Sequence, residues 1–311
     1  MPNPLPPLAQ QVILITGASS GIGAALAQSL ATRYPGIRLV LAARTAVTLE
    51  QLATQYRQLG AEILVVPTDM AAPEQVQTLA TTAIAHFGRV DSLVNNAGYG
   101  QMGPVELVPI AAAQHQFAVN VLGVVGLIQA LIPTMRQQGG GRILNISSIA
   151  GRLAFPFGGL YSASKFALEG LSDTLRMELS PFNIQVSVIE PGPVQTNFFQ
   201  VATQGVEQTI PDPQKTPYRA AFAQIETLEQ RVGDRAWSSE QVVAVILKAL
   251  TDPVPRPRYL AATGGRVLLF LMTKLLPTKM VDGFWQRFYG IDLVERDWKN
   301  RLGSLPRITV R

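Results

Sequence analysis

"ILITGASSGIGAALAQSL", residues 13–30, joins an apolar run to a helical pattern through a turn that holds three glycines. Glycine lets the backbone turn sharply and come close to a phosphate, because it has no Cβ. The helix start then offers unpaired N–H groups and the positive end of its dipole to a pyrophosphate. Gly17, Gly21 and Gly23 therefore predict a dinucleotide-binding turn, and a simple tight turn is the alternative for the glycines alone.

Short apolar runs alternate with longer helical patterns over the first 195 residues. The near-continuous Val, Ile and Leu of these runs is typical of strands covered on both faces, as in a parallel sheet. Repeated strand–helix units predict a single α/β domain with a doubly wound parallel sheet, a Rossmann fold. We expect strands at 12–16, 38–43, 62–67, 92–96, 142–147 and 185–191, and helices at 21–33, 48–59, 73–87, 112–138 and 161–180.

The alternation stops after Pro191. Residues 193–236 are predicted to be a substrate loop, with a helix around 217–232. A further helix at 239–251 leads through a proline-rich break to a last strand at Tyr259–Ala262.

The chain after the last strand has a different pattern, since residues 265–300 look helical and partly amphipathic. We therefore predict a dinucleotide-binding catalytic domain at 1–262, including the substrate loop, and a helical C-terminal extension at 263–311.

Composition excludes several classes of protein. With 47% hydrophobic and 15% charged residues, the chain buries a sizeable core and is not disordered. It has no cysteine, so disulfide and thiolate chemistry are excluded. Its two histidines, His86 and His115, are isolated and do not have the spacing of metal ligands, so we expect no metal site.

The net charge of +5 is unevenly placed. Residues 256–311 hold 11 basic and 4 acidic side chains, a charge of +7, which leaves −2 for the rest. A nearly neutral body argues against nucleic-acid binding. The basic tail leaves anionic lipid or an acidic partner as alternatives.

The N-terminal stretch "MPNPLPPLAQQ" has neither a basic start nor an apolar core, so we expect no signal peptide and a cytoplasmic location. No uncharged apolar run approaches the roughly 20 residues that a bilayer span needs. The longest candidate, Val119–Pro133, is interrupted by Asn120 and Gln129, and packing against a sheet explains it.

"YSASK", residues 161–165, places a tyrosine one helical turn before a lysine. A free phenol has a pKa of roughly 10, and moving it to about 7 requires about 4 kcal/mol in favour of the phenolate. One ammonium about 4 Å away supplies on the order of 4 kcal/mol at an effective dielectric of about 20. The spacing fits an acid–base pair, and an exposed tyrosine beside a solvated lysine is the alternative for these two residues alone.

The glycine spacing, Gly-x-x-x-Gly-x-Gly after Thr16, resembles the cofactor turn of the short-chain dehydrogenase/reductase family. The resemblance covers about residues 5–200 and is specific, because further features follow in the family's order. Besides "YSASK" they are Asp69 after the third strand, "NNAG" at 95–98, Asn120, Ser148 thirteen residues before the tyrosine, and "PG" at 191–192.

The resemblance implies four catalytic residues. Tyr161 would be the general acid–base that protonates a carbonyl during hydride transfer, and Lys165 would tune it and bind the nicotinamide ribose. Ser148 would hydrogen-bond the carbonyl or alkoxide, with Ser147 as the alternative if the register is off by one. Asn120 would hold a water linked to Lys165, or would make a helix–strand hydrogen bond, or both.

The resemblance also implies a set of cofactor-binding residues, most of which follow strand ends, with three on the helices at 112–138 and 161–180. They are Gly17, Ser19, Ser20, Gly21, Ile22, Gly23, Arg44, Thr45, Asp69, Met70, Asn96, Ala97, Gly98, Asn120, Tyr161, Lys165, Pro191, Gly192, Val194 and Thr196.

The second strand predicts which cofactor is used. An acid at its end would recognise a ribose 2′-hydroxyl, whereas a cation would recognise a 2′-phosphate. Here Arg44 follows Ala43, and a guanidinium with the Thr45 hydroxyl suits a phosphate. We expect NADP(H), although Ser19 and Ser20 supply no second cation; an ordinary surface arginine is the alternative.

Aromatic residues in two loops predict the substrate class. They are Phe155, Phe157, Phe198, Phe199, Tyr218 and Phe222. Such a set suits a bulky apolar carbonyl or alcohol, such as a steroid, retinoid, long-chain or aromatic compound. The alternative is that some of these rings only pack the loop.

The C-terminal extension departs from compact family members. Residues 265–290 combine an apolar run with cations, which suits a peripheral membrane contact, a lid or a packing element. The helices at 112–138 and 161–180 remain available for a homodimer, with a homotetramer as the alternative.

The leading interpretation is an NADP(H)-dependent oxidoreductase that interconverts a carbonyl and an alcohol on an apolar substrate. A β-ketoacyl thioester reductase is the enzymatic alternative, and it predicts a basic patch beside the pocket. A non-catalytic NADP-binding sensor or scaffold is the alternative from another class, against which the four intact catalytic residues argue.

Overall fold

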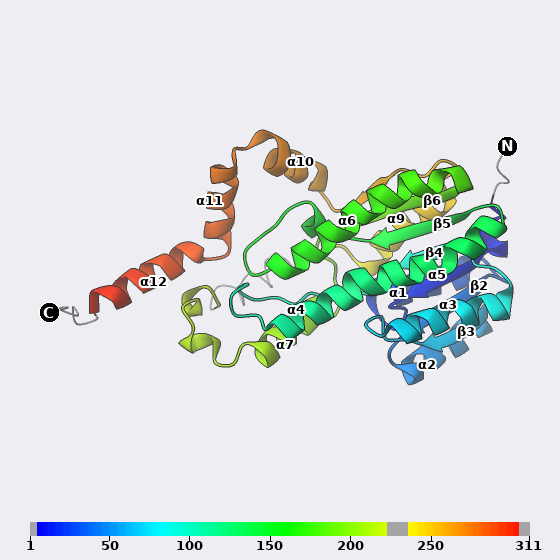
Figure 1. The fold of residues 1–311 in the computed structure, drawn as a ribbon, viewed down its shortest axis with the longest axis horizontal. Helices are drawn as coiled ribbons and strands as arrows, with labels where there is room; N and C mark the ends of the chain where they lie inside the picture. The colour runs from blue at the N-terminus through cyan, green and yellow to red at the C-terminus, as the bar shows by residue number, and fades with distance from the viewer. Residues whose placement is uncertain (1–4, 223–235, 305–311) are drawn as a thin grey trace.

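The computed structural model describes residues 5–222 and 236–304. Its centre is a sheet of seven parallel strands in the order β3-β2-β1-β4-β5-β6-β7 (Figure 1). The strands are β1 (Val12–Thr16), β2 (Arg38–Ala43), β3 (Glu62–Pro67), β4 (Ser92–Asn95), β5 (Gly141–Ile146), β6 (Ile184–Pro191) and β7 (Arg258–Ala261). This arrangement confirms the predicted doubly wound parallel sheet.

Helices cover both faces of the sheet (Figure 1). One face is packed by α1 (Gly21–Arg33), α2 (Ala46–Gln58) and α9 (Ser239–Thr251), and the other by α3 (Pro73–Phe87), α5 (Gly123–Gln137) and α6 (Gly159–Leu179). Successive strand residues point to opposite faces, so Ile13 joins the first core and Leu14 the second. Two dry cores therefore hold the ends of the strands in place.

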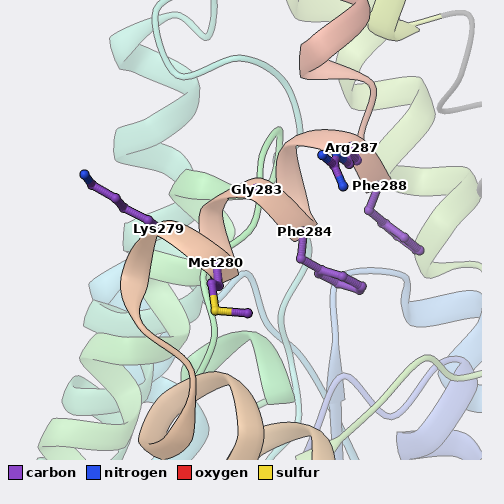
Figure 2. A pocket seen from close by; sticks show the side chains of 6 residues that line it. All are labelled: Lys279, Met280, Gly283, Phe284, Arg287 and Phe288. Atoms are coloured by element: carbon purple, nitrogen blue, oxygen red, sulfur yellow. The ribbon is translucent and has the colours of Figure 1, made fainter.

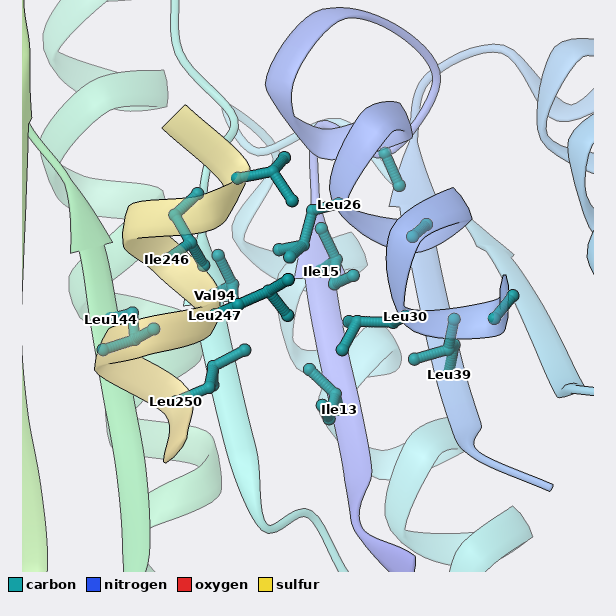
Figure 3. Close-up of a cluster of buried hydrophobic side chains, with 14 of the residues drawn as sticks. Ile13, Ile15, Leu26, Leu30, Leu39, Val94, Leu144, Ile246, Leu247 and Leu250 are labelled. Carbon is teal, nitrogen blue, oxygen red and sulfur yellow. The ribbon is translucent and has the colours of Figure 1, made fainter. Parts of the chain in front are cut away.

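The first core shows how the two halves of the chain are joined. In Figure 3, Leu26 and Leu30 of α1 and Ile246 of α9 converge on Ile13 and Ile15 of the central strand. All five side chains are fully buried. Helix α1, which follows the glycine turn, is thereby packed against α9, the helix that precedes the last strand.

One long helix crosses the second face. It comprises α4 (Ile110–Phe117), a π-helical turn at Ala118–Leu122, and α5. By length and composition, residues 110–137 are the one helix in the described part of the chain that is long and apolar enough to cross a membrane. The helix is therefore a longer apolar element than the sequence analysis expected. Its Leu127 and Leu131 are fully buried in the core, as in a helix packed on a sheet.

The substrate loop contains a helix that the sequence analysis missed. Residues Phe198–Thr209 form α7, where an irregular loop was predicted. This stretch has no proline, and the prolines that suggested a loop begin only at Pro211. Of the helix predicted around 217–232, residues 219–222 are helical and the remainder lies outside the described residues.

Over its described residues, which end at Ser304, the C-terminal extension forms three helices. They are α10 (Gly265–Phe270), continued by a π-helical turn at Leu271–Leu275, then α11 (Thr278–Phe288) and α12 (Ile291–Ser304). Pro277 separates the first two helices, and Gly290, with a φ of 72°, separates the last two. Figure 1 shows the extension leaving the sheet and running beyond the body of the molecule.

Candidate active site

The predicted site residues gather at one edge of the sheet. Strand β1 lies between β2 and β4, so the chain winds away in opposite directions on either side of it. In such sheets, the crevice beyond the carboxyl ends of the strands at this reversal binds ligands. The glycine turn, Asn96, Ser148 and Gly192 follow the ends of β1, β4, β5 and β6 respectively.

The glycine turn is tight and requires glycine. Gly17 and Gly21 have φ values of +66° and +52°, in the left-handed region. A Cβ on Gly23 would lie 2.3 Å from the carbonyl oxygen of Gly17 and 2.6 Å from Nδ2 of Asn96. Any larger residue at position 23 would therefore displace the turn. Ser20 precedes α1 and Ile22 lies in the first turn of α1, so both belong to the glycine turn, which also includes Ser19.

Asn96 and Thr16 connect the turn to β4. Asn96 Nδ2 donates to the carbonyl oxygens of Thr16 at 3.0 Å and Gly17 at 3.2 Å. The Thr16 hydroxyl accepts from the backbone N–H groups of Asn96 and Ala97, both at 3.0 Å. Thr16 was quoted in the sequence analysis only as part of the turn, and its position before Gly17 is the signal for this role.

The segment after β6 also lies beside the glycine turn. Gly192 N donates to the carbonyl oxygen of Ala261 at 3.1 Å, which continues the sheet beyond Pro191. Val194 pairs with Trp237. Thr196 lies over the glycine turn, since its methyl group is 3.2 Å from the position of a Cβ on Gly21.

The predicted cofactor-binding residues after β2 and β3 are spread along the same edge. Arg44 and Thr45 are exposed between β2 and α2, and Arg44 makes no hydrogen bond or ion pair with a described residue. Asp69 is half-buried, and its Oδ1 accepts from the backbone of Ala71 at 2.9 Å. Met70 is buried.

Tyr161 and Lys165 lie on the first turns of α6, and both are buried. Lys165 Nζ is 5.9 Å from the centre of the Tyr161 ring and donates to the carbonyl oxygen of Ile146 at 2.8 Å. A Cβ on Gly98 would lie 3.5 Å from the same Nζ. The lysine thus lies between the phenol and the loop after β4.

Burial dominates the ionisation of this pair. It raises the pKa of Tyr161 to about 12, and the Ser148 hydroxyl acts in the opposite direction. Burial lowers the pKa of Lys165 to about 8, against the field of Glu169. The sequence-based argument that the lysine brings the phenol toward neutrality is wrong for the protein alone, because desolvation of the phenolate outweighs it. Tyr161 is therefore a protonated phenol at neutral pH, as a general acid must be.

The lowered pKa of Lys165 gives a prediction about stability. Its folded pKa of about 8 lies below the model value of 10.5, so the unfolded chain binds more protons between these values and stability rises with pH there. Compared with Lys165→Met, the wild type should gain about 3 kcal/mol in free energy of unfolding between pH 7.5 and 10.5. Urea unfolding of both proteins across this range measures it. A difference between the two that does not change with pH would contradict a buried, readily deprotonated lysine.

The two candidate serines are separated by the structure. Ser148 Oγ accepts from the backbone of Ala150 at 3.1 Å and donates to the carbonyl oxygen of Pro191 at 3.4 Å. Ser147 is buried on another side, since a Cβ on Gly151 would lie 2.7 Å from its hydroxyl. Of the two, Ser148 is the hydroxyl whose hydrogen bond acts on the pKa of the Tyr161 phenol.

Asn120 lies in the π-helical turn between α4 and α5, a local geometry that often marks functional sites. Its Nδ2 donates to the Tyr99 carbonyl oxygen at 2.9 Å and to Ser164 Oγ at 3.1 Å, and its Oδ1 accepts from Tyr99 N at 3.1 Å. The amide therefore hydrogen-bonds the loop after β4 and α6, rather than a strand as one alternative expected. Tyr99 and Ser164, which hold this amide, were missed because nothing in their spacing identifies them.

The predicted aromatic residues form two groups. Phe198 of α7 lies against the phenol, with 5.3 Å between the ring centres of Phe198 and Tyr161, and Phe199 follows it. Phe157 contacts Tyr218 and Phe222 at 5.9 and 5.7 Å between ring centres. Only the first group is in ring contact with Tyr161 among the described residues.

The second group is completed by the C-terminal extension. Phe155 stacks on Tyr289 with 5.5 Å between ring centres and is 6.3 Å from Trp285. Phe157 also contacts Tyr289, at 6.3 Å. The sequence analysis did not include Trp285 and Tyr289 among the substrate-site residues, because they are far from Phe155 along the chain and no local pattern predicts the contact.

Comparison with known proteins agrees with this geometry. The family model of short chain dehydrogenases matches residues 11–207. Human 17-beta-hydroxysteroid dehydrogenase type 1 is 36% identical over 275 residues, which cover 86% of this chain and 82% of the relative.

Solved structures give the same result. A short-chain dehydrogenase/reductase from Burkholderia phymatum in complex with NAD has a TM-score of 0.75 and 30% identity, covering 85% of this chain and 93% of its own. L-sorbose reductase from Gluconobacter frateurii, complexed with NADPH and L-sorbose, has a TM-score of 0.70 and 28% identity, covering 82% and 96%. The chain is a nucleotide-binding oxidoreductase and belongs to the short-chain dehydrogenase/reductase family.

Proposed function

We propose that this oxidoreductase uses NADP(H) to interconvert a carbonyl and an alcohol on an apolar substrate, with Tyr161 as the general acid–base. The observation that carries the proposal is the buried pair of Tyr161 and Lys165, with the Ser148 hydroxyl acting on the phenol. The pair lies at the edge of the sheet that carries the glycine turn. The proton donor and the expected binding site of the hydride donor therefore lie at the same edge of the sheet.

The glycine turn fits a dinucleotide, because the absence of a Cβ on Gly23 lets the turn pack tightly against Asn96 at the start of α1, where backbone N–H groups are free to bind a pyrophosphate. A nicotinamide cofactor supplies the hydride when bound. The glycine turn and the start of α1 would bind its pyrophosphate, and Lys165 would bind its nicotinamide ribose.

The proton steps belong to the chain's own side chains. In the reduction, the Tyr161 hydroxyl donates its proton to the carbonyl oxygen, and Ser148 hydrogen-bonds the same oxygen to orient it. The raised pKa of Tyr161 keeps the phenol protonated for this step. In the oxidation, the Tyr161 oxygen accepts the alcohol proton, with the neighbouring Lys165 ammonium stabilising the phenolate.

Arg44 supports NADP(H) over NAD(H). It is exposed after β2, with no carboxylate partner among the described residues. The two solved relatives differ in cofactor, one in complex with NAD and the other with NADPH, so the preference depends on residues such as this one. A guanidinium binds a 2′-phosphate through opposite charge and paired hydrogen bonds, whereas a 2′-hydroxyl offers it one uncharged acceptor.

The Phe198 ring against Tyr161 supports an apolar substrate. Phe155 and Phe157, joined by Tyr289, extend the aromatic surface. The human relative is named for a hydroxysteroid, which is a bulky apolar alcohol. We propose this substrate class on both grounds.

A homodimer is proposed from exposed apolar side chains on the π-helical turn before α5 and on α6. Leu122, Phe166 and Met177 are 65%, 45% and 63% exposed. A homotetramer is the alternative, and the cytoplasmic location also stays a prediction.

A cofactor-exchange experiment tests the proposal. We expect the purified protein to oxidise NADPH faster than NADH with apolar ketones and aldehydes, and Arg44→Asp to reduce kcat/KM for NADPH by about 10- to 100-fold while leaving NADH less affected. The matched control is Arg33→Glu, an exposed arginine at the far end of α1. Faster turnover with NADH would defeat the role of Arg44, and turnover restricted to small polar carbonyls would defeat the apolar pocket.

A further inference from the structure

The outer surface of the first two C-terminal helices is apolar and unpartnered. Among residues 265–288, five large apolar side chains are exposed: Val267, Phe270, Leu275, Met280 and Phe284. Their exposed fractions run from 44% to 64%, in a protein that buries most residues of this kind. We call these five residues, with the cations among them, the outer C-terminal surface.

The opposite side of the same helices is fixed to the body. Leu269 is buried, and a Cβ on Gly265 would lie 3.0 Å from Ala262, so α10 begins packed against the end of β7. Trp285 and Tyr289 contact Phe155. One side of these helices already packs on the body. The exposed apolar side chains on the other side are therefore not explained by helices that have failed to pack. They are the free side of an amphipathic element.

Cations surround this apolar surface. Residues 265–288 carry Arg266, Lys274, Lys279 and Arg287 against a single acid, Asp282. All five charged side chains are exposed, and none makes an ion pair with a described residue. A net charge of +3 therefore surrounds the unpartnered apolar side chains.

The two kinds of side chain meet in one groove on α11. It has a volume of about 600 Å³ and is lined by Lys279, Met280, Gly283, Phe284, Arg287 and Phe288. Figure 2 shows Met280, Phe284 and Phe288 projecting from the helix, with Lys279 at one end and Arg287 beside Phe288 at the other. Phe284 and Phe288 stack with 5.9 Å between ring centres.

We propose that the outer C-terminal surface docks on a membrane surface that contains anionic lipid. Apolar side chains on one side of a helix enter the boundary of the acyl chains, and cations beside them contact acidic headgroups. A second copy of the chain would bring +3 against +3 across a symmetric interface, so charge favours lipid over self-association.

The position of the surface gives docking a consequence for catalysis. Trp285 and Tyr289 join α11 to Phe155 and Phe157, which lie in the segment before Tyr161 on α6. The docked face would therefore lie beside the aromatic residues proposed to receive an apolar substrate. This consequence depends on the proposed function, whereas the docking itself does not.

Vesicle sedimentation of the full chain tests the docking. We expect the protein to sediment with vesicles of phosphatidylcholine containing phosphatidylserine, less with phosphatidylcholine alone, and less in high salt. Replacing Phe270 and Phe284 by Ser, or Lys274 and Lys279 by Glu, should lower the partition coefficient by at least about tenfold. Turnover of a water-soluble carbonyl should be unchanged in both double variants, because neither touches the catalytic residues.

The matched control is Val254→Ser, which removes a side chain that is 85% exposed and lies outside the outer C-terminal surface. Three results would overturn the proposal. They are no sedimentation with either vesicle, a loss of vesicle binding in the Val254→Ser control equal to that in the double variants, or a dimer in light scattering that becomes a monomer in the Phe284→Ser variant. The last result would assign the surface to a second copy. Because binding is measured without substrate, an inactive enzyme that still sediments would refute only the proposed function.

Discussion

Tyr161→Phe is expected to lower kcat for carbonyl reduction by about 10² to 10⁴-fold, the range for loss of a general acid. The substitution removes one hydroxyl and keeps the ring that packs against Phe198. Because the phenol is buried and its pKa is raised to about 12, no exposed side chain replaces its proton in the crevice. Cofactor affinity should change little, so the loss should appear in kcat.

Steady-state NADPH oxidation, with the dissociation constant for NADPH measured in parallel, checks this prediction. The matched control is Tyr34→Phe, which removes a hydroxyl at the end of α1 away from the glycine turn. The control should keep wild-type kcat. A Tyr161→Phe enzyme within a few-fold of the wild type would contradict the acid–base role.

The second large effect is expected for Gly23→Ala, which should weaken NADPH binding by about 10- to 100-fold. The new methyl group would lie 2.3 Å from the carbonyl oxygen of Gly17 and 2.6 Å from Nδ2 of Asn96. Neither atom can move away easily, because the Gly17 oxygen belongs to the backbone and the Asn96 amide is hydrogen-bonded to the turn. The turn must shift, and with it the N–H groups that would bind the pyrophosphate.

Gly170→Ala is the matched control, because Gly170 lies within α6 and a Cβ there would meet nothing within 4 Å. It should bind NADPH as the wild type does and be slightly more stable, since alanine favours a helix. Fluorescence titration gives the dissociation constants, and circular dichroism checks the fold. Wild-type affinity in a folded Gly23→Ala protein would show that this turn does not hold the cofactor.

The sheet was predictable because its strands are buried on both faces. "VILIT" and "RLVLAA" are short, continuous and apolar, and they became β1 and β2 with the predicted bounds. The helix at 198–209 was missed, since it comes just before a proline-rich stretch and has only one buried residue, Ala202. The packing of α11 on Phe155 could not be predicted either, because contacts between distant segments leave no local pattern.

The site was predictable as a set of positions but not as an electrostatic environment. The glycine turn and Ser148 follow the ends of β1 and β5, and Tyr161 lies near the start of α6, in the order that the motifs indicated. The direction of the Tyr161 pKa shift was wrong, because its burial depends on surrounding elements such as α7. The hydrogen bonds of Thr16 and Tyr99 involve backbone groups, which every residue carries, so sequence alone does not identify them.

A single turnover of NADPH bound to the enzyme, with a responsive apolar ketone, tests most directly whether Tyr161 supplies the proton. The loss of dihydropyridine absorbance is followed in H₂O and in D₂O, for the wild type and for Tyr161→Phe. The account predicts a fast wild-type transient that slows in D₂O and a transient that is slowed by orders of magnitude in the variant. Equal transients in the two proteins would contradict it.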